Sequence, residues 1–203
     1  MEAIITGDIV NSEHQADAKW LVTLKRFLSR LGASPMVWEV YRGDEFQLRV
    51  PLSKALETAI HIKAVMKSIK DLDVRMGIGL GEVTFVGNGV SESNGPAYRR
   101  SGRSFESLKE DKNKLTIATG DAFHDDTLNL VLRLASDFMN DWSTVSAEIV
   151  AIALENPEAS QNEIAKRLGI QQSAVSQRQK RARLDLVFDL LAYYSKIIKE
   201  IAP

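Results

Sequence analysis

Residues 160–183, with the sequence SQNEIAKRLGIQQSAVSQRQKRAR, predict two short helices joined by a tight turn. Ser160 is a favourable N-cap, and Glu163 follows it at the spacing of a capping box. Gly169 stands where the first helix must end, because glycine takes the left-handed conformation without steric cost. Ala165 is small where the two helices cross, which lets them approach closely, and Val175 points back at the first helix. Together these positions indicate a helix-turn-helix.

The second of these helices, over residues 171–183, carries four basic side chains and no acidic one. Basic side chains neutralise DNA phosphates, and amide or hydroxyl side chains read base edges in the major groove. The alternative is a helical hairpin with a solvated basic face, which the agreement of cap, turn, apolar positions and charge disfavours. We therefore expect double-stranded DNA to bind here, through Gln171, Gln172, Ser173, Ser176, Gln177, Arg178, Lys180 and Arg181.

Composition limits the class of protein. The chain has 203 residues, enough for one large or two small domains, and its 44% hydrophobic and 26% charged residues are ordinary for a globular protein. The absence of cysteine excludes disulfides, iron–sulfur clusters and cysteine-based zinc sites. No apolar run is long enough to span a bilayer and no signal pattern opens the chain, so we expect a cytoplasmic protein without membrane association.

The net charge of −1 conceals an asymmetry between the two ends of the chain. Residues 156–203 hold eight Lys and Arg against five Asp and Glu, whereas the remainder holds 18 against 22. A mildly acidic body with a basic end is typical of a protein in which only the C-terminal part contacts nucleic acid.

The order of predicted elements divides the chain near residue 120. Before that point, apolar periodicity predicts strands at 3–9, 36–41, 46–50, 73–85 and 115–118, with helices at 12–32, 52–70 and 97–109. The first six of these elements follow the β-α-β-β-α-β order of a ferredoxin-like fold on one antiparallel sheet. We expect an α+β protein, with a ferredoxin-like domain at residues 1–120 and an all-α domain at 121–203 that contains the helix-turn-helix at 160–183.

The all-α part is predicted to contain helices at 126–142 and 144–155 and one unbroken last helix at 171–198. Val187, Leu191, Tyr194 and Ile198 form an apolar stripe along that last helix. We expect the stripe to pack on the helix at 126–142. The alternative is that it forms the seam of a homodimer, and both uses are compatible.

Two carboxylates fall where a sheet of this topology brings them together. Asp8 ends the first strand, and Asp44 lies in the turn between the second and third strands, so both are expected at one end of the sheet. A carboxylate pair that binds Mg²⁺ and a triphosphate is the centre of two-metal phosphoryl chemistry. The alternative is ordinary turn chemistry, in which Asp is common at strand ends and hairpins.

Residues 1–120 resemble the palm-type domain of class III nucleotidyl cyclases and GGDEF-type diguanylate cyclases. The matching pieces are Asp8-Ile9 after the first strand, GDEF at residues 43–46 and RMGIG at residues 75–79. The resemblance implies that Asp8 and Asp44 bind Mg²⁺. It also implies that the backbone of residues 9–12, including Asn11 and Ser12, holds phosphates of a nucleotide.

The chain departs from those cyclases at two places. Val40 occupies the position of their base-selecting lysine, and residues 94–103 lack a clean match to their transition-state asparagine and arginine. Arg99, Arg100 and Arg103 are instead expected to bind phosphate. The sequence therefore favours binding of a nucleotide or other phosphorylated ligand over cyclase activity.

The helix pair resembles the fourth-region helix-turn-helix of sigma factors, in which an arginine-rich tail follows a Val-Ser pair. Nearly the whole chain resembles the bacterial SatD-like family, through GDIVNS at 7–12, RGD at 42–44, NGPAYR at 94–99, Trp142-Ser143 and SAVSQ at 173–177. That resemblance implies a cytoplasmic protein associated with stress and supplies no reaction.

Three functions are compatible with these patterns. We expect a DNA-binding regulatory protein whose N-terminal domain senses a nucleotide or another phosphorylated ligand. The first alternative is a Mg²⁺-dependent enzyme of nucleotidyl or phosphoryl transfer that the helix-turn-helix localises on DNA. The second is an interaction protein without a ligand, whose C-terminal helices contact a polymerase or another partner.

Overall fold

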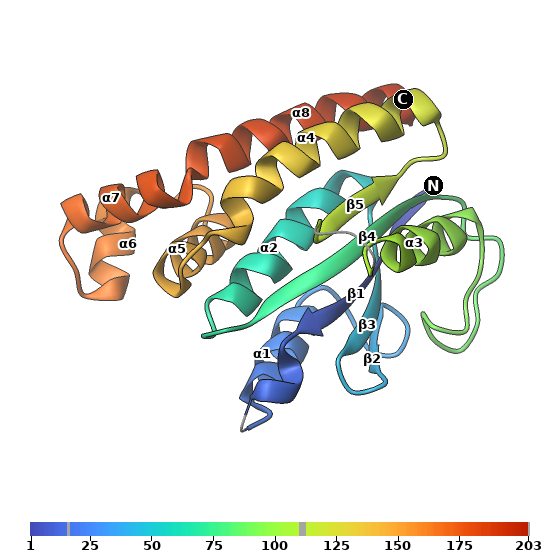
Figure 1. Ribbon diagram of the computed structural model, residues 1–203, viewed down its shortest axis with the longest axis horizontal. Helices are drawn as coiled ribbons and strands as arrows, with labels where there is room; N and C mark the ends of the chain where they lie inside the picture. Colours follow the sequence, from blue (N-terminus) through green and yellow to red (C-terminus); the bar gives the residue numbers. More distant parts are fainter. Residues whose placement is uncertain (16, 110–112, 203) are drawn as a thin grey trace.

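The computed structural model describes residues 1–15, 17–109 and 113–202. Within them the chain forms one five-stranded mixed sheet and eight α-helices, so the protein is α+β as predicted (Figure 1). The predicted helix at 12–32 includes residue 16, which lies outside the described residues.

The sheet contains β1 (Glu2–Val10), β2 (Trp38–Tyr41), β3 (Glu45–Val50), β4 (Asp73–Gly81) and β5 (Leu115–Ala118), in the order β2-β3-β1-β4-β5. The first four strands are antiparallel to their neighbours, but β5 runs parallel to β4. The expectation of a wholly antiparallel sheet is therefore wrong at the fifth strand. The helix α3 (Pro96–Ser107) crosses from the end of β4 back to its start, and such a crossover returns the chain in the parallel direction.

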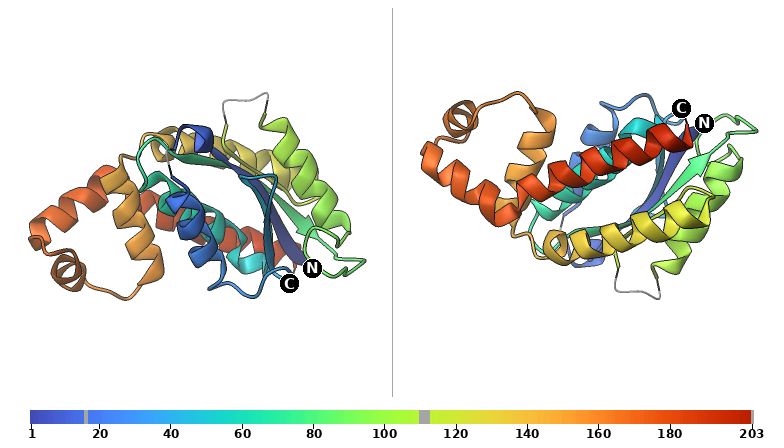
Figure 2. Two further views of the ribbon diagram at one scale, coloured as in Figure 1. Left: turned by 90° about the horizontal axis from the view of Figure 1, so that it is seen from below. Right: turned by 90° about the horizontal axis from the view of Figure 1, so that it is seen from above.

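Helices cover the two faces of the sheet unequally. On one face lie α1 (Lys19–Leu28) and α2 (Ala55–Lys67), and α5 (Thr144–Glu155) packs on α2 (Figures 1 and 2). The other face carries α3, which lies over β4 and β1. Alternating strand residues such as Ile5, Phe46 and Ile78 are buried in the same apolar core as the first group of helices.

The C-terminal helices share that core. α4 (Ala122–Asn140) packs beside β5, and α8 (Leu184–Ile201) packs on α4 and α2. Residues of α5, of α7 (Gln172–Ala182) and of α8 belong to the same buried cluster as the sheet residues. The predicted division at residue 120 falls between β5 and α4, and buried apolar contacts continue across it.

Two predicted helices are broken. The segment at 12–32 contains a 3-10 turn at Ser12–His14 and then α1, because Asp17 accepts a hydrogen bond from the backbone N–H of Lys19 and so favours a new helix start. The segment at 171–198 is interrupted at Arg183, which has φ 50° and ψ 48°. There the indole N–H of Trp142 donates to the carbonyl of Ala182 at 2.9 Å, taking the acceptor that an unbroken helix would use.

The apolar stripe on α8 faces the interior. Val187, Tyr194 and Ile198 are buried, and the hydroxyl of Tyr194 donates to the carbonyl of Leu52 at 2.8 Å, just before α2. The stripe therefore packs within the chain, as expected, on α4 and α2. Because it is covered by the protein's own helices, it is not the surface through which a second copy would bind.

One buried carboxylate joins four elements of the fold. Asp73 at the start of β4 binds Lys63 and Lys114 at 2.7 Å each and Lys67 at 3.4 Å. Lys63 also donates to the side-chain oxygen of Asn140 at 2.9 Å, and Lys67 donates to its carbonyl at 2.8 Å. Burial lowers the pKa of Lys63 to about 8. Burial acts to raise the pKa of Asp73, but the surrounding lysines outweigh it and hold that pKa below its usual value.

Replacing Asp73 with Asn leaves the buried ammonium of Lys63 without its counter-charge. Removing one partner of a buried ion pair costs about 3–5 kcal/mol, so the free energy of unfolding measured in urea should fall by that amount. Glu57→Gln is the control, because it breaks an exposed pair with Lys54 and should cost less than about 1 kcal/mol. Equal losses in the two variants would show that the Asp73 network is no stronger than a surface pair.

Candidate functional site

The strand register places the two predicted carboxylates at one end of the sheet. Asp8 on β1 lies opposite Glu45 on β3 and opposite Arg75 on β4. Asp44 directly precedes Glu45, and its carbonyl accepts a hydrogen bond from the backbone N–H of Ile9 at 3.3 Å. We call the surface formed by Asp8, Ser12, Asp44 and Arg75 the sheet end.

Arg75 is a residue of the sheet end whose pairing with Asp8 the sequence did not reveal. Its Nε donates to Oδ1 of Asp8 at 3.0 Å, and its Nη2 bonds the other carboxylate oxygen, so the pair is bidentate. The hydrogen bond to Asp8 raises the pKa of Arg75, and the two side chains are 30% and 13% exposed. Both oxygens of Asp8 are thus bound by a cation that Mg²⁺ would have to displace.

Asp44, Ser12 and Asn11 also have partners within the protein. The hydroxyl of Ser12 donates to Asp44 at 2.7 Å, and the amide of Asn11 donates to the carbonyl of Asp71 at 2.9 Å. Asn11 has φ 66°, in the left-handed region. These bonds fix the turn after β1. Because the oxygens of Asp8 and Asp44 already accept hydrogen bonds within the protein, they fit Mg²⁺ poorly as ligands in this arrangement. Among the residues that the structure describes, no three His, Asp or Glu side chains gather as metal ligands.

Glycines on β4 let α3 lie against the sheet. A Cβ added to Gly79 would stand 2.2 Å from the carbonyl of Ala97 and from the backbone nitrogen of Ser101, and one at Gly77 would stand 2.4 Å from the nitrogen of Phe105. The hydroxyl of Ser101 donates to the carbonyl of Gly77 at 2.9 Å. The RMGIG sequence at 75–79 therefore serves helix packing in this fold.

The direction of α3 separates Arg100, one of the predicted phosphate-binding arginines, from the carboxylates. Arg100 donates to the carbonyl of Leu80 at 2.6 Å, near the end of β4, whereas Asp8 lies opposite the start of that strand. Arg99 and Arg103 are exposed on α3. The structure does not bring Arg100 together with Asp8, because α3 runs antiparallel to β4 and its first turns lie at the opposite end of that strand.

The second candidate surface is the helix pair of α6 (Gln161–Leu168) and α7. The predicted capping box is confirmed: the backbone N–H of Glu163 donates to the hydroxyl of Ser160, and the N–H of Ser160 donates to the Glu163 carboxylate at 2.7 Å. Gly169 ends α6 with φ 65°, as predicted. Ala165 and Val175 are buried where the helices pack together.

α7 presents one polar face to solvent. Val175 and Ala182 are buried on its inner side. Positions three and four residues apart share one side of a helix, so the exposed residues form a continuous stripe. The stripe consists of Gln172, Ser173, Ser176, Gln177, Lys180 and Arg181.

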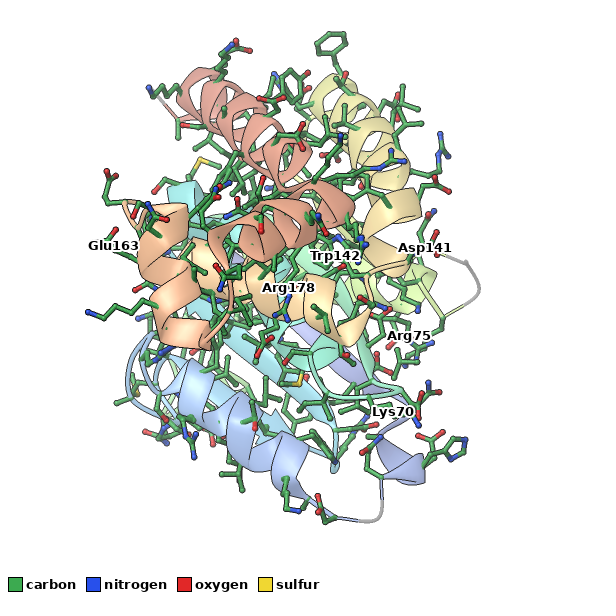
Figure 3. The ribbon with its side chains drawn as sticks, turned by 90° about the vertical axis from the view of Figure 1, so that its left-hand side faces the viewer. Lys70, Arg75, Asp141, Trp142, Glu163 and Arg178 are labelled. Carbon is green, nitrogen blue, oxygen red and sulfur yellow. The ribbon has the colours of Figure 1, made fainter. Side chains whose placement is uncertain are left out.

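Two of the predicted DNA-contacting residues have partners within the fold, and a third lies outside α7. Arg178 pairs with Glu148 of α5 at 3.5 Å and is 26% exposed, so it faces α5 and lies beside the stripe (Figure 3). The amide of Gln172 bonds Gln161 at the start of α6. Gln171 is exposed and directly precedes α7. The sequence alone did not distinguish these positions, because helical spacing does not identify the neighbour on each side.

The helix pair and the sheet end lie on the same side of the molecule. Figure 3, which looks at that side, shows Arg178 of α7 in front and Arg75 of β4 below it. The N- and C-termini lie at the opposite end (Figure 1). No helix among residues 1–15, 17–109 and 113–202 combines the length and apolarity needed to cross a membrane.

The fold and these surfaces define an α+β protein with a mixed sheet and an exposed helix pair at one end. The model of the SatD family matches residues 3–192. Since the match covers most of the chain, the protein belongs to the SatD family, as the sequence motifs suggested. None of the curated proteins matches the sequence.

Because α3 lies so close to β4, we expect alanine substitutions at two glycines to have opposite effects on stability. Gly79→Ala places a methyl group against the backbone of α3 and should lower stability by about 1–3 kcal/mol, as overpacking does. Gly102→Ala, on α3 itself, meets nothing within 4 Å and should raise stability by about 0.5–1 kcal/mol through helix propensity. Thermal and urea unfolding of both variants measure the difference. The same sign for both would contradict the packing described here.

Proposed function

We propose that this member of the SatD family is a DNA-binding regulatory protein and that α6 and α7 form a helix-turn-helix. The observation that carries the proposal is the exposed stripe of α7, which combines hydroxyl and amide side chains with Lys180 and Arg181 and contains no acidic residue. In a helix-turn-helix the second helix enters the major groove, where such side chains contact bases and phosphates. The glycine turn and buried crossing support the same assignment.

The pairing of Arg178 with Glu148 refines which cations contact DNA. A guanidinium held by a carboxylate of α5 is partly neutralised, whereas Lys180 and Arg181 are exposed at the C-terminal end of α7. We therefore assign phosphate contacts to Lys180 and Arg181, and base contacts to Ser173, Ser176 and Gln177. Arg178 holds α7 on α5 in this proposal.

We also infer that residues 1–120 form a ferredoxin-like, palm-type domain that binds a phosphorylated ligand at the sheet end. The strand order β2-β3-β1-β4, with α1 and α2 on one face, supports that topology. Arg75 supplies a partly exposed guanidinium there, and Ser12 a hydroxyl. A phosphate that replaces Asp8 as the partner of Arg75 would keep the guanidinium paired.

The DNA proposal is tested by Lys180→Ala/Arg181→Ala. Each lost phosphate contact weakens binding to all duplexes alike, so affinity should fall and the salt slope should decrease by about two units, as fluorescence anisotropy at several salt concentrations would show. The control, Lys196→Ala/Lys199→Ala, removes the same charge from exposed positions of α8, far from α7, and should change neither. Equal behaviour of the two variants would reject the helix-turn-helix assignment.

The ligand proposal is tested by thermal unfolding with a panel of nucleotides, with and without Mg²⁺. A phosphorylated ligand should raise the unfolding temperature, and Asp8→Asn/Arg75→Gln should abolish that rise without leaving either charge unpaired. Arg42→Gln, at a guanidinium 81% exposed in the nearby turn, is the matched control. A blank panel, or a rise that survives the double variant, contradicts the proposal. Release of pyrophosphate from a nucleotide would instead favour the transferase alternative.

A further inference from the structure

An apolar groove of about 360 Å³ runs along the surface between α4 and α8. Figure 2, in the view from above, shows these two helices side by side on the outside of the molecule. Leu134 on α4 is 67% exposed and Leu186 on α8 is 41% exposed, and Phe138 and Tyr193 also line the groove. Leu130, one turn before Leu134, is 48% exposed and extends the apolar surface along α4. This is a different face of α8 from the buried stripe that contains Tyr194.

The groove carries one basic side chain, of Arg183 directly before α8, and one acidic side chain, of Asp189 on α8. The guanidinium of Arg183 lies 5.8 Å from the centre of the Phe138 ring, which holds the positive charge over the groove. Asp189 lines the groove further along α8 and is exposed. Arg183 and Asp189 stand three residues before and three residues after Leu186, so in the sequence the opposite charges flank an exposed apolar residue at equal spacing, and both line the groove.

We propose that a second copy of this chain covers the groove, with the two-fold axis at Leu186. In a two-fold interface, if residue i of one subunit contacts residue j of the other, then residue j of the first also contacts residue i of the second. Two antiparallel α8 helices that cross at Leu186 therefore bring Arg183 of each subunit next to the partner subunit's Asp189. The same crossing brings the two Leu186 side chains together and covers Leu134. The rim of one groove is thus complementary to the rim of another copy.

The position of the axis has a consequence for DNA recognition, which rests on the function proposed for α7. Ser176, in the middle of the exposed stripe, precedes Leu186 by ten residues, and because the chain changes direction at Arg183 the two positions are no further apart than the rise of about 15 Å that an unbroken helix would give. Doubled across the axis, with the width of the helices added, this length sets an upper limit of about 30–40 Å on the separation of the two stripes. One turn of DNA is about 34 Å, the spacing at which dimeric helix-turn-helix proteins contact successive major grooves.

Sedimentation equilibrium of the full chain tests the dimer without DNA. The wild-type protein should associate to a dimer in the micromolar range. Asp189→Arg should weaken the dimer at least about tenfold, because the new arginine of each subunit would lie next to Arg183 of the other, and this repulsion occurs twice in the dimer. Arg183→Asp/Asp189→Arg should recover most of the affinity, since the exchange restores opposite charges across the axis. Asp tolerates the left-handed backbone at position 183, so the exchange suits the local fold.

Leu186→Glu places two carboxylates at the axis and should also give a monomer. Val22→Glu, at a residue of α1 that is 57% exposed and far from the groove, is the matched control and should leave the dimer intact. A wild-type protein that stays monomeric overturns the proposal. A dimer that survives both Asp189→Arg and Leu186→Glu overturns it as well, because the copies then meet through another surface.

Duplex binding by the same proteins separates this inference from the proposed function. A monomeric wild-type protein that binds DNA through Lys180 and Arg181 rejects the dimer and leaves the helix-turn-helix in place. A wild-type dimer that binds no duplex rejects the helix-turn-helix and leaves the dimer in place. With both intact, Asp189→Arg should lose affinity for a duplex that carries two half-sites and keep its affinity for a single half-site.

Discussion

The buried carboxylate of Asp73 is the constraint on which the relative placement of the elements depends. A charge in the interior must be paired, and Asp73 is paired with Lys63, whose side chain extends from α2 into the core. Lys63 in turn bonds Asn140 at the end of α4, and two residues later Trp142 bonds the carbonyl of Ala182, the last residue of α7. This series of bonds therefore connects the position of α7 to β4 of the sheet.

The same strand carries the sheet end. Arg75 follows Asp73 by two residues on β4, so the pair with Asp8 and the lysine network share a short, stiff segment of backbone. A ligand that replaced Asp8 as the partner of Arg75 would act directly on that segment. Ligand binding at the sheet end would change the position of α7 only when the ligand binds one arrangement of α7 more tightly than another. The two surfaces are linked by ion pairs and hydrogen bonds together with two short stretches of backbone, from Arg75 to Asp73 and from Asn140 to Trp142.

Features encoded by neighbouring residues could be predicted from the sequence, and features that depend on distant contacts could not. Ser160 and Gly169 mark the ends of α6 because capping and the left-handed turn are local chemistry. The break at Arg183 has no such signal: the carbonyl of Ala182 beside it accepts a hydrogen bond from Trp142, forty residues earlier. The carboxylate of Asp8 was recognised, but its pairing with Arg75 follows only from the strand register.

The bond between Trp142 and Ala182 also bears on how DNA would be recognised. It lies at the junction of α7 and α8, the one place where a left-handed residue lets the two helices change direction, and it is buried. Under the function proposed for α7, a helix held at its base in this way cannot adapt its angle to each DNA sequence. The DNA duplex would then have to deform to fit the helix. Base pairs that α7 does not contact would therefore affect affinity through how easily the duplex bends at them.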